Sequence, residues 1–195
     1  MEGQHKFDYA RISEMRSRYV PDAAVLSAVL PGPSDTIIDV GGSGDGYYSI
    51  LFSRFASKVY AVERDRDAAR YIEDRVKGGG VKNVDVWNTD ICEVFPEVQF
   101  NKVFFSNSFH DLRCREGLID VLLNRSRPGL QVTFVEFKKV ESIGPPPLEV
   151  RIADNELATL MTGRGGFRLV RKAYLEIHYI HTYELQGHGD NKKTL

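Results

Sequence analysis

The residues best suited to contact a ligand are glycines between a strand-like and a helical segment: Gly41, Gly42, Gly44 and Gly46. Glycine tolerates positive φ and lets a ligand approach the backbone, and the following helix offers unpaired N–H groups. In a doubly wound sheet this turn lies at the carboxyl edge, where ligands bind. A nicotinamide or flavin site would need Gly-x-Gly-x-x-Gly, but Tyr47 or Ser49 occupies the third position. A tight turn without a ligand stays an alternative.

Two carboxylates follow the neighbouring predicted strands. Glu63 ends the second strand, where a carboxylate can accept hydrogen bonds from both hydroxyls of a ribose. Asp90 follows the third strand, where it can accept a hydrogen bond from the exocyclic amine of adenine. The alternatives are a solvated charge for Glu63 and a helix N-cap for Asp90. Together with the glycine turn, the two residues predict an adenosine lying across the strand ends.

Histidines supply the candidate acid–base groups. His110 stands just past the fourth predicted strand, and a neutral imidazole can accept a proton at neutral pH. A histidine that only packs or forms hydrogen bonds is the alternative for this position. His178 and His181 are three residues apart on a predicted strand and so point to opposite faces, which argues against a metal site.

These residues depend on a regular alternation of strands and helices. Strands are predicted at 36–40, 58–62, 84–87, 102–106, 131–137, 167–170 and 175–185. Helices are predicted at 8–18, after Pro21 as the first helical residue, from Tyr47, and at 66–77, 112–126 and 154–161. The alternation indicates an α/β protein with a parallel sheet covered by helices on both faces.

Composition limits the class of protein. The chain has 195 residues, 42% of them apolar, which predicts one domain over residues 1–186 and a disordered tail at 187–195. A net charge of −1 gives no general attraction to nucleic acid. The sequence contains no membrane-spanning apolar run and no export signal, so we expect a cytoplasmic protein. Cys92 and Cys114 are then expected to be reduced thiols.

Several segments together resemble class I S-adenosylmethionine (SAM)-dependent methyltransferases. The similar segments are 38–47, 59–63, 88–91, 106–112 and 127–129. Further similarity to the UbiE-like, or methyltransferase 11, type lies at 5–8, 136–139, 144–146 and 151–152. The resemblance implies a Rossmann-like sheet of seven strands, the last antiparallel, with SAM as cofactor and S-adenosylhomocysteine (SAH) as product. It also implies methyl transfer to a small-molecule acceptor, mainly by positioning and desolvation.

The resemblance also implies roles for individual residues. Cofactor contacts are expected from Asp39, Gly41, Gly42, Ser43, Gly44, Gly46, Glu63, Arg64, Asp90, Ile91, Ser106 and Asn107. Substrate contacts are expected from Phe7, Tyr19, Phe109, Lys138 and Arg151, with residues 1–30 covering the site and the two cations forming a basic rim. Ordinary packing and a solvated surface are the alternatives for these substrate residues.

The glycine loop departs from the family spacing by one residue. The frame that we favour aligns Gly42, Gly44 and Gly46, and an ungapped frame would place Ser43 and Asp45 at glycine positions. Asp45 would repel the SAM carboxylate unless it points away or caps the next helix.

Two other functions remain open on the same fold. An RNA or protein methyltransferase would favour a basic stripe or an Asn-Pro-Pro-Tyr motif, but residues 106–109 read Ser-Asn-Ser-Phe. A SAM-binding protein without transfer activity is the other alternative.

Overall fold

A computed structural model of the chain describes residues 8–141 and 146–187. Seven strands form one sheet in the order β3-β2-β1-β4-β5-β7-β6. They are β1 (Thr36–Val40), β2 (Lys58–Glu63), β3 (Val84–Asn88), β4 (Lys102–Ser106), β5 (Gln131–Phe137), β6 (Phe167–Tyr174) and β7 (His178–Leu185). Strand β7 runs antiparallel to both of its neighbours and the other pairings are parallel, which confirms the expected topology.

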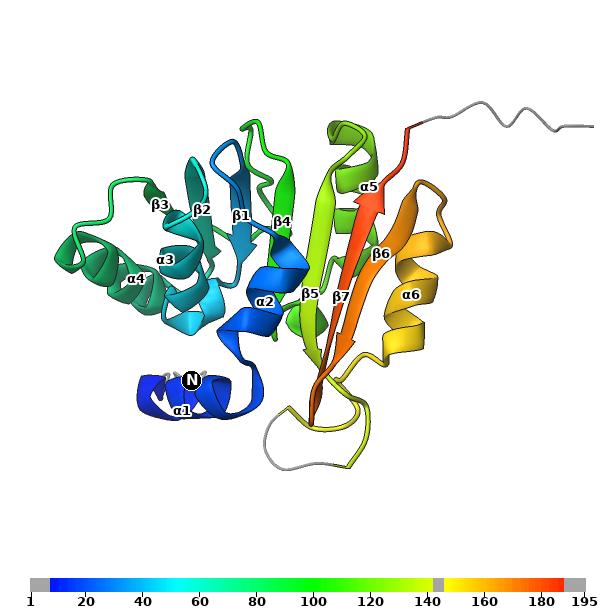
Figure 1. Ribbon diagram of the computed structural model, residues 1–195, viewed down its shortest axis with the longest axis horizontal. Helices are drawn as coiled ribbons and strands as arrows, with labels where there is room; N and C mark the ends of the chain where they lie inside the picture. Colours follow the sequence, from blue (N-terminus) through cyan, green and yellow to red (C-terminus); the bar gives the residue numbers. More distant parts are fainter. Residues whose placement is uncertain (1–7, 142–145, 188–195) are drawn as a thin grey trace, which may run out of the picture.

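Helices cover both faces of this sheet (Figure 1). The α-helices are α1 (Tyr9–Tyr19), α2 (Asp22–Val29), α3 (Tyr47–Ser53), α4 (Arg66–Gly78), α5 (Arg115–Arg125) and α6 (Asp154–Thr162), and the 3-10 turns are η1 (Gly42–Gly44) and η2 (Phe109–Asp111). Helices α2, α3 and α4 contribute to one core cluster, and α5 and α6 contribute to the other. The arrangement confirms a doubly wound α/β fold.

The central strands are apolar because each of their faces is buried. Successive side chains of a strand point to opposite faces, so Ile37 and Phe104 enter one core while Ile38 and Phe105 enter the other. This packing explains why continuous apolar runs, rather than an alternating pattern, mark these strands in the sequence.

The termini of several predicted elements differ from the structure; the strand predicted at 175–185, for example, begins at His178. Helix α5 begins at Arg115 instead of Leu112, because the preceding turn η2 ends with Leu112 in an extended conformation (φ −75°, ψ 125°). Pro21 is the N-cap of α2 rather than its first helical residue. Strand β6 continues to Tyr174, well past the predicted end, because it pairs with β7 along its whole length.

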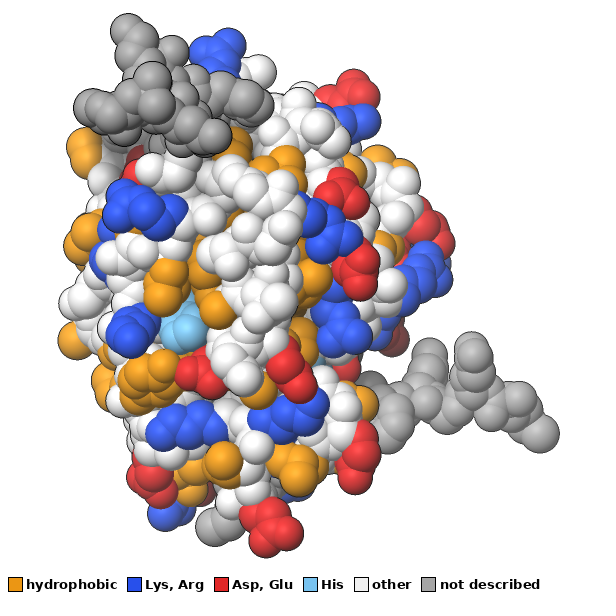
Figure 2. Space-filling view, turned by 90° about the vertical axis from the view of Figure 1, so that its right-hand side faces the viewer, with side chains coloured by type: hydrophobic (Ala, Val, Ile, Leu, Met, Phe, Trp, Pro, Cys, Tyr) orange, Lys and Arg blue, Asp and Glu red, His pale blue; other side chains and the backbone are white. Residues whose placement is uncertain are grey.

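The surface beside α6 and β6 carries charges of both signs. Figure 2 shows Lys and Arg side chains interspersed with Asp and Glu on the face turned toward the viewer. This mixture agrees with the net charge of −1. Within the described ranges, no helix is long and apolar enough to cross a membrane.

Candidate active site

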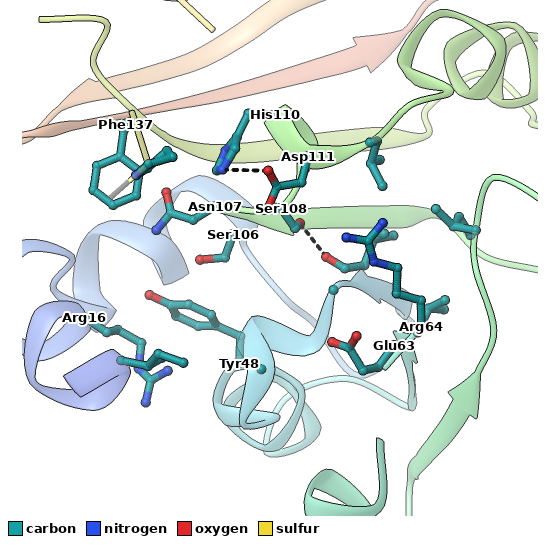
Figure 3. A pocket seen from close by; sticks show the side chains of 18 of the residues that line it. Arg16, Tyr48, Glu63, Arg64, Ser106, Asn107, Ser108, His110, Asp111 and Phe137 are labelled. Atoms are coloured by element: carbon teal, nitrogen blue, oxygen red, sulfur yellow. Dashed lines mark hydrogen bonds and ion pairs between the residues drawn. The ribbon is translucent and has the colours of Figure 1, made fainter. Parts of the chain in front are cut away.

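A cavity of about 480 Å³ lies at the carboxyl edge of the sheet, between the strand ends and α1 (Figure 3). The predicted cofactor residues that line it are Gly41, Gly44, Glu63, Arg64, Asp90, Ile91, Ser106 and Asn107, and His110 lines it too. Helix α1 and its flanks contribute Asp8, Arg11, Ile12, Met15, Arg16 and Val20 to the same wall. The strand ends therefore bring together most of the residues that were predicted to bind the cofactor.

The predicted glycines have two different positions in the loop. Gly41 (φ +86°) and Gly44 line the cavity, and a Cβ on Gly41 would approach the Ser108 Cβ to 2.6 Å. Gly42 and Gly46 face α4 instead, where an added Cβ would lie 2.7 and 2.6 Å from Ile72 atoms. These two glycines are thus required for packing of the loop against α4 rather than for an open approach to the cavity.

Asp45 points away from the cavity, so it would not repel the carboxylate of a SAM molecule bound there. It is 3% exposed, and its oxygens accept hydrogen bonds from Arg16 at 2.9 and 2.8 Å. One of its oxygens also caps α3 through the Tyr47 N–H at 3.1 Å, and Arg75 lies 3.1 Å away. Its φ of −125° is not glycine-like, which supports the shifted frame of the loop.

Asp39 lies beneath the loop instead of in the cavity. Its Oδ2 accepts a hydrogen bond from the Ser49 hydroxyl at 2.5 Å, and the side chain is fully buried. Burial raises the pKa of Asp39 to about 7. The residue supports the loop from below and does not line the ligand space, so the predicted direct cofactor contact is wrong for Asp39.

The two predicted carboxylates sit at the strand ends that face the cavity. Glu63 is 6% exposed, and burial raises its pKa to about 7; one oxygen accepts the Asp65 N–H at 2.9 Å. Asp90 accepts the Cys92 N–H at 2.8 Å and lies 3.3 Å from Arg113. Asp90 therefore caps the following turn and lines the cavity at once, so both of its predicted roles are compatible.

His110 is held by a carboxylate that we did not single out as a site residue. Its Nδ1 lies 2.6 Å from Glu136 Oε2, and Glu136 on β5 is 1% exposed. The other oxygen, Oε1, accepts backbone N–H groups of Phe109 (3.0 Å) and His110 (3.3 Å). Glu136 is 26 residues from His110, and only the similarity of segment 136–139 drew attention to it.

At the end of the cavity opposite Glu63, Asn107 lies beside Phe137 (Figure 3). Asn107 has a φ of +52°, and its Nδ2 lies 3.2 Å from His178 Nε2. Among the described residues, Asn107 Oδ1, the Tyr48 hydroxyl and His178 Nδ1 are buried without a hydrogen-bond partner. Burial lowers the pKa of His178 to about 4, so its imidazole is neutral at pH 7. Unpartnered polar atoms in a cavity are suited to a ligand.

The structure corrects the predicted substrate residues. Tyr19 and Phe109 are buried in the two cores and do not line the cavity. Arg151 is 4% exposed and donates to the backbone carbonyls of Pro146, Lys138 and Val140, so it braces a loop and forms no open basic rim.

The remaining predicted positions lie away from the cavity or outside the described residues. Lys138 donates to the Glu176 carbonyl at 3.1 Å and does not line it. Phe7 and residues 188–195 of the predicted tail lie outside the described residues, as does the side chain of Ser43.

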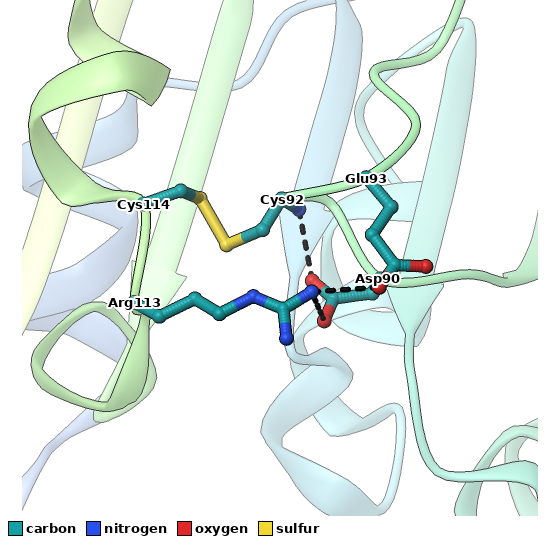
Figure 4. The surroundings of a disulfide bond; sticks show 5 residues. All are labelled: Asp90, Cys92, Glu93, Arg113 and Cys114. Atoms are coloured by element: carbon teal, nitrogen blue, oxygen red, sulfur yellow. Dashed lines mark hydrogen bonds and ion pairs between the residues drawn. A yellow bond between two sulfur atoms is a disulfide. The ribbon is translucent and has the colours of Figure 1, made fainter.

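The expectation of two reduced thiols is also wrong, because Cys92 and Cys114 form a disulfide (Figure 4). Their Cα atoms are 5.5 Å apart, within the range that a disulfide bridges. The bond joins the turn after Asp90 to the residue before α5. Sequence separation alone gave no indication of this proximity. Among the described residues, no group of three or more His, Cys, Asp or Glu side chains could hold a metal.

No family model matches the chain. It is 37% identical to protein-L-isoaspartate O-methyltransferase 2 of Nitrosococcus oceani over 74 residues. The aligned segment makes up 38% of this chain and 34% of the relative. It is 30% identical to the probable cobalt-precorrin-6B C(15)-methyltransferase (decarboxylating) of Methanococcus maripaludis over 76 residues, which are 39% of this chain and 41% of that relative. The matches thus span well under half the length of these relatives.

Solved structures match over nearly the whole chain. A SAM-dependent methyltransferase from Aquifex aeolicus has a TM-score of 0.77 at 23% identity, covering 92% of this chain and 100% of the other. The N-methyltransferase NodS from Bradyrhizobium japonicum WM9, in complex with SAH, has a TM-score of 0.68 at 11% identity, covering 95% and 90%. These similarities show that the chain has the Rossmann-like fold of class I SAM-dependent methyltransferases.

Proposed function

We propose that this chain is a SAM-dependent methyltransferase of the UbiE-like type. The observation that carries the proposal is the joint position of the glycine turn, Glu63 and Asp90 around one cavity at the carboxyl edge of the sheet. An isolated glycine turn is common in α/β proteins, whereas a turn with carboxylates on the next two strand ends suits an adenosine. The relatives and structural neighbours are methyltransferases, which supports the same activity.

The chemical character of the cavity fits SAM along its length. Glu63 would accept hydrogen bonds from the ribose hydroxyls, and Asp90 and Ile91 would hold the adenine, with Arg64 beside them. The backbone of Gly41 and Gly44 would face the amino-acid part. At that end, Ser106 and the unpartnered Asn107 Oδ1 suit the ammonium group. When bound, SAM supplies an activated methyl group, so the protein needs chiefly to position the acceptor and exclude water.

The methyl acceptor is best explained as a small molecule. A cavity of about 480 Å³ is within the range of roughly 300–1,000 Å³ for small-ligand sites. Helix α1 lines the same cavity with Ile12 and Met15, and Phe137 lines it from β5. These apolar side chains restrict access of water, which suits a small acceptor enclosed together with the cofactor.

Calorimetric titration with SAM and with SAH tests the cofactor assignment. We expect both to bind with micromolar affinity, because they share the adenosine and amino-acid groups that the cavity would contact. NAD, which shares the adenosine but not the amino acid, serves as the control and should bind much more weakly. A folded protein that binds neither SAM nor SAH, or that prefers NAD, would refute the proposal.

A further inference from the structure

We propose that His110 and Glu136 form a proton-accepting pair, and that the methyl acceptor is therefore a compound whose reacting atom carries an exchangeable proton on oxygen or nitrogen. The inference rests on the proposed function and adds the chemical class of the acceptor. It assigns His110 as the group that takes the proton and Glu136 as a positioning residue that acts through it.

The geometry leaves one imidazole nitrogen directed to the cavity. Glu136 Oε2 lies 2.6 Å from Nδ1 of His110, and Oε1 is occupied by two backbone N–H groups of the same turn. A carboxylate fixed in this way selects the tautomer in which Nδ1 carries the hydrogen. Nε2 then keeps its lone pair; among the described residues it has no hydrogen-bond partner, and its nearest charged neighbour is Asp111 Oδ1, 3.6 Å away and 60% exposed. His110 lines the cavity, so this lone pair is available to a ligand there (Figure 3).

The surrounding charges make His110 a stronger base than an ordinary histidine. Burial alone would lower its pKa, but the hydrogen bond and charge of Glu136 outweigh burial, and Asp111 adds to their effect. Arg115 on α5 acts in the opposite direction. His178, which lines the same cavity from β7, has a pKa of about 4 and stays uncharged at neutral pH. The result is a raised pKa for His110.

A proton acceptor is useful only for one class of methyl acceptor. A hydroxyl or amine that gains a methyl cation must lose its proton, whereas a thioether or tertiary amine has none to lose. The proton passes to Nε2 of His110 while the acceptor's lone pair forms the new bond to carbon and the electrons of the broken carbon–sulfur bond stay on sulfur. The charge balances: the sulfonium becomes a neutral thioether, and His110 becomes an imidazolium that Glu136 stabilises until solvent takes the proton.

The pair can be tested by ligand binding alone, because SAM carries a positive charge where SAH is neutral. We would measure the dissociation constants of both by calorimetry between about pH 5.5 and 8.5. Protonated His110 repels the sulfonium, so the ratio Kd(SAM)/Kd(SAH) should rise as the pH falls through the pKa of His110. The expected rise is about threefold or more, the effect of two unit charges roughly 6 Å apart in water. Glu63 and Asp39, each with a pKa of about 7, lose their negative charge over the same range and so also weaken the attraction to the sulfonium. The contribution of His110 is therefore the difference between the wild type and a variant that lacks the imidazole.

Three variants separate the pair from a structural role. In His110→Ala the rise of the ratio should be smaller than in the wild type by the threefold or more that His110 contributes, and an equal rise in the two proteins would refute the pair. In Glu136→Gln the transition should shift to lower pH, because the imidazolium loses its carboxylate, and a residue that only stabilised the fold would not move it. His181→Asn is the control, since this buried histidine of β7 does not line the cavity and burial lowers its pKa, so the transition should stay as in the wild type.

Acceptor class is tested with two probes of similar shape, 4-methylphenol and thioanisole, by SAH formation in the presence of SAM. We expect SAH only with the phenol, and a rate lowered about 10²–10⁴-fold in His110→Ala. Transfer to thioanisole at a comparable rate would overturn the proposal; if neither probe reacts, the binding ratio decides. A pH-independent ratio in a wild type that binds both ligands would refute the pair and leave the proposed function intact. Absence of binding of both would refute the proposed function itself.

Discussion

Glu63 is the single residue whose removal should have the clearest effect on cofactor affinity. In Glu63→Ala, we expect SAM and SAH binding to weaken by about 1.5–3 kcal/mol, the value of hydrogen bonds to a charged group, or roughly 10- to 150-fold. The variant should fold. Burial raises the pKa of Glu63 to about 7, which means that the ionised carboxylate does not stabilise the folded chain. Calorimetry measures the change. Glu73→Ala on α4, which removes a carboxylate paired with Lys77 at the surface, is the control, and equal affinities in both variants would contradict the ribose role.

At the scale of elements, a disulfide joins the two loops that carry Asp90 and His110. Cys92 and Cys114 are 22 residues apart, and closing a loop of this length stabilises a fold by about 2–4 kcal/mol in the chain-entropy account. We therefore expect reductant to lower the urea midpoint of unfolding. A Cys92→Ser, Cys114→Ser double variant should start at the lower midpoint and show no response to reductant. An unchanged wild-type midpoint in reductant would contradict the prediction.

Helix α1 is attached to the glycine loop by one buried ion pair. Arg16 is 8% exposed, pairs with Asp45 through two hydrogen bonds, and lies 3.9 Å from the centroid of the Tyr47 ring. Arg16→Met should cost about 1–3 kcal/mol, less than the loss of a lone buried partner, because Arg75 still contacts Asp45. Hydrogen exchange in α1 should also become faster.

The control for this substitution is a second arginine on the same helix. Arg18→Met removes an exposed side chain of α1 and should change neither stability nor exchange appreciably. Equal exchange rates for α1 in the two variants would show that the ion pair does not hold the helix over the cavity.

For the whole molecule, the sequence was informative about local features and uninformative about long-range pairs. The central strands were predictable because apolar runs end at charged or turn residues, as β2 does at Glu63. The predicted substrate contacts of Tyr19 and Phe109 were wrong, because an aromatic residue that lines a site and one that packs in the core have the same sequence pattern. The Glu136 contact and the disulfide join residues far apart in sequence, and no spacing rule applies to them.

The stability of the whole fold should also depend on pH through a carboxyl group under the glycine loop. Burial raises the pKa of Asp39 to about 7, so the folded chain binds this proton more tightly than the unfolded chain does. Its contribution therefore falls as the pH rises from about 4 to about 7 and is constant above that range. His178, with a pKa lowered to about 4, acts in the opposite sense, so the wild-type curve alone is ambiguous.

The comparison with Asp39→Asn isolates one group: relative to wild type, this variant should gain about 1–3 kcal/mol between pH 5 and pH 8 in urea unfolding. Asp85→Asn, at a half-exposed carboxylate on β3, should show no such gain, and a parallel pair of curves for Asp39→Asn and wild type would mean that Asp39 is charged throughout.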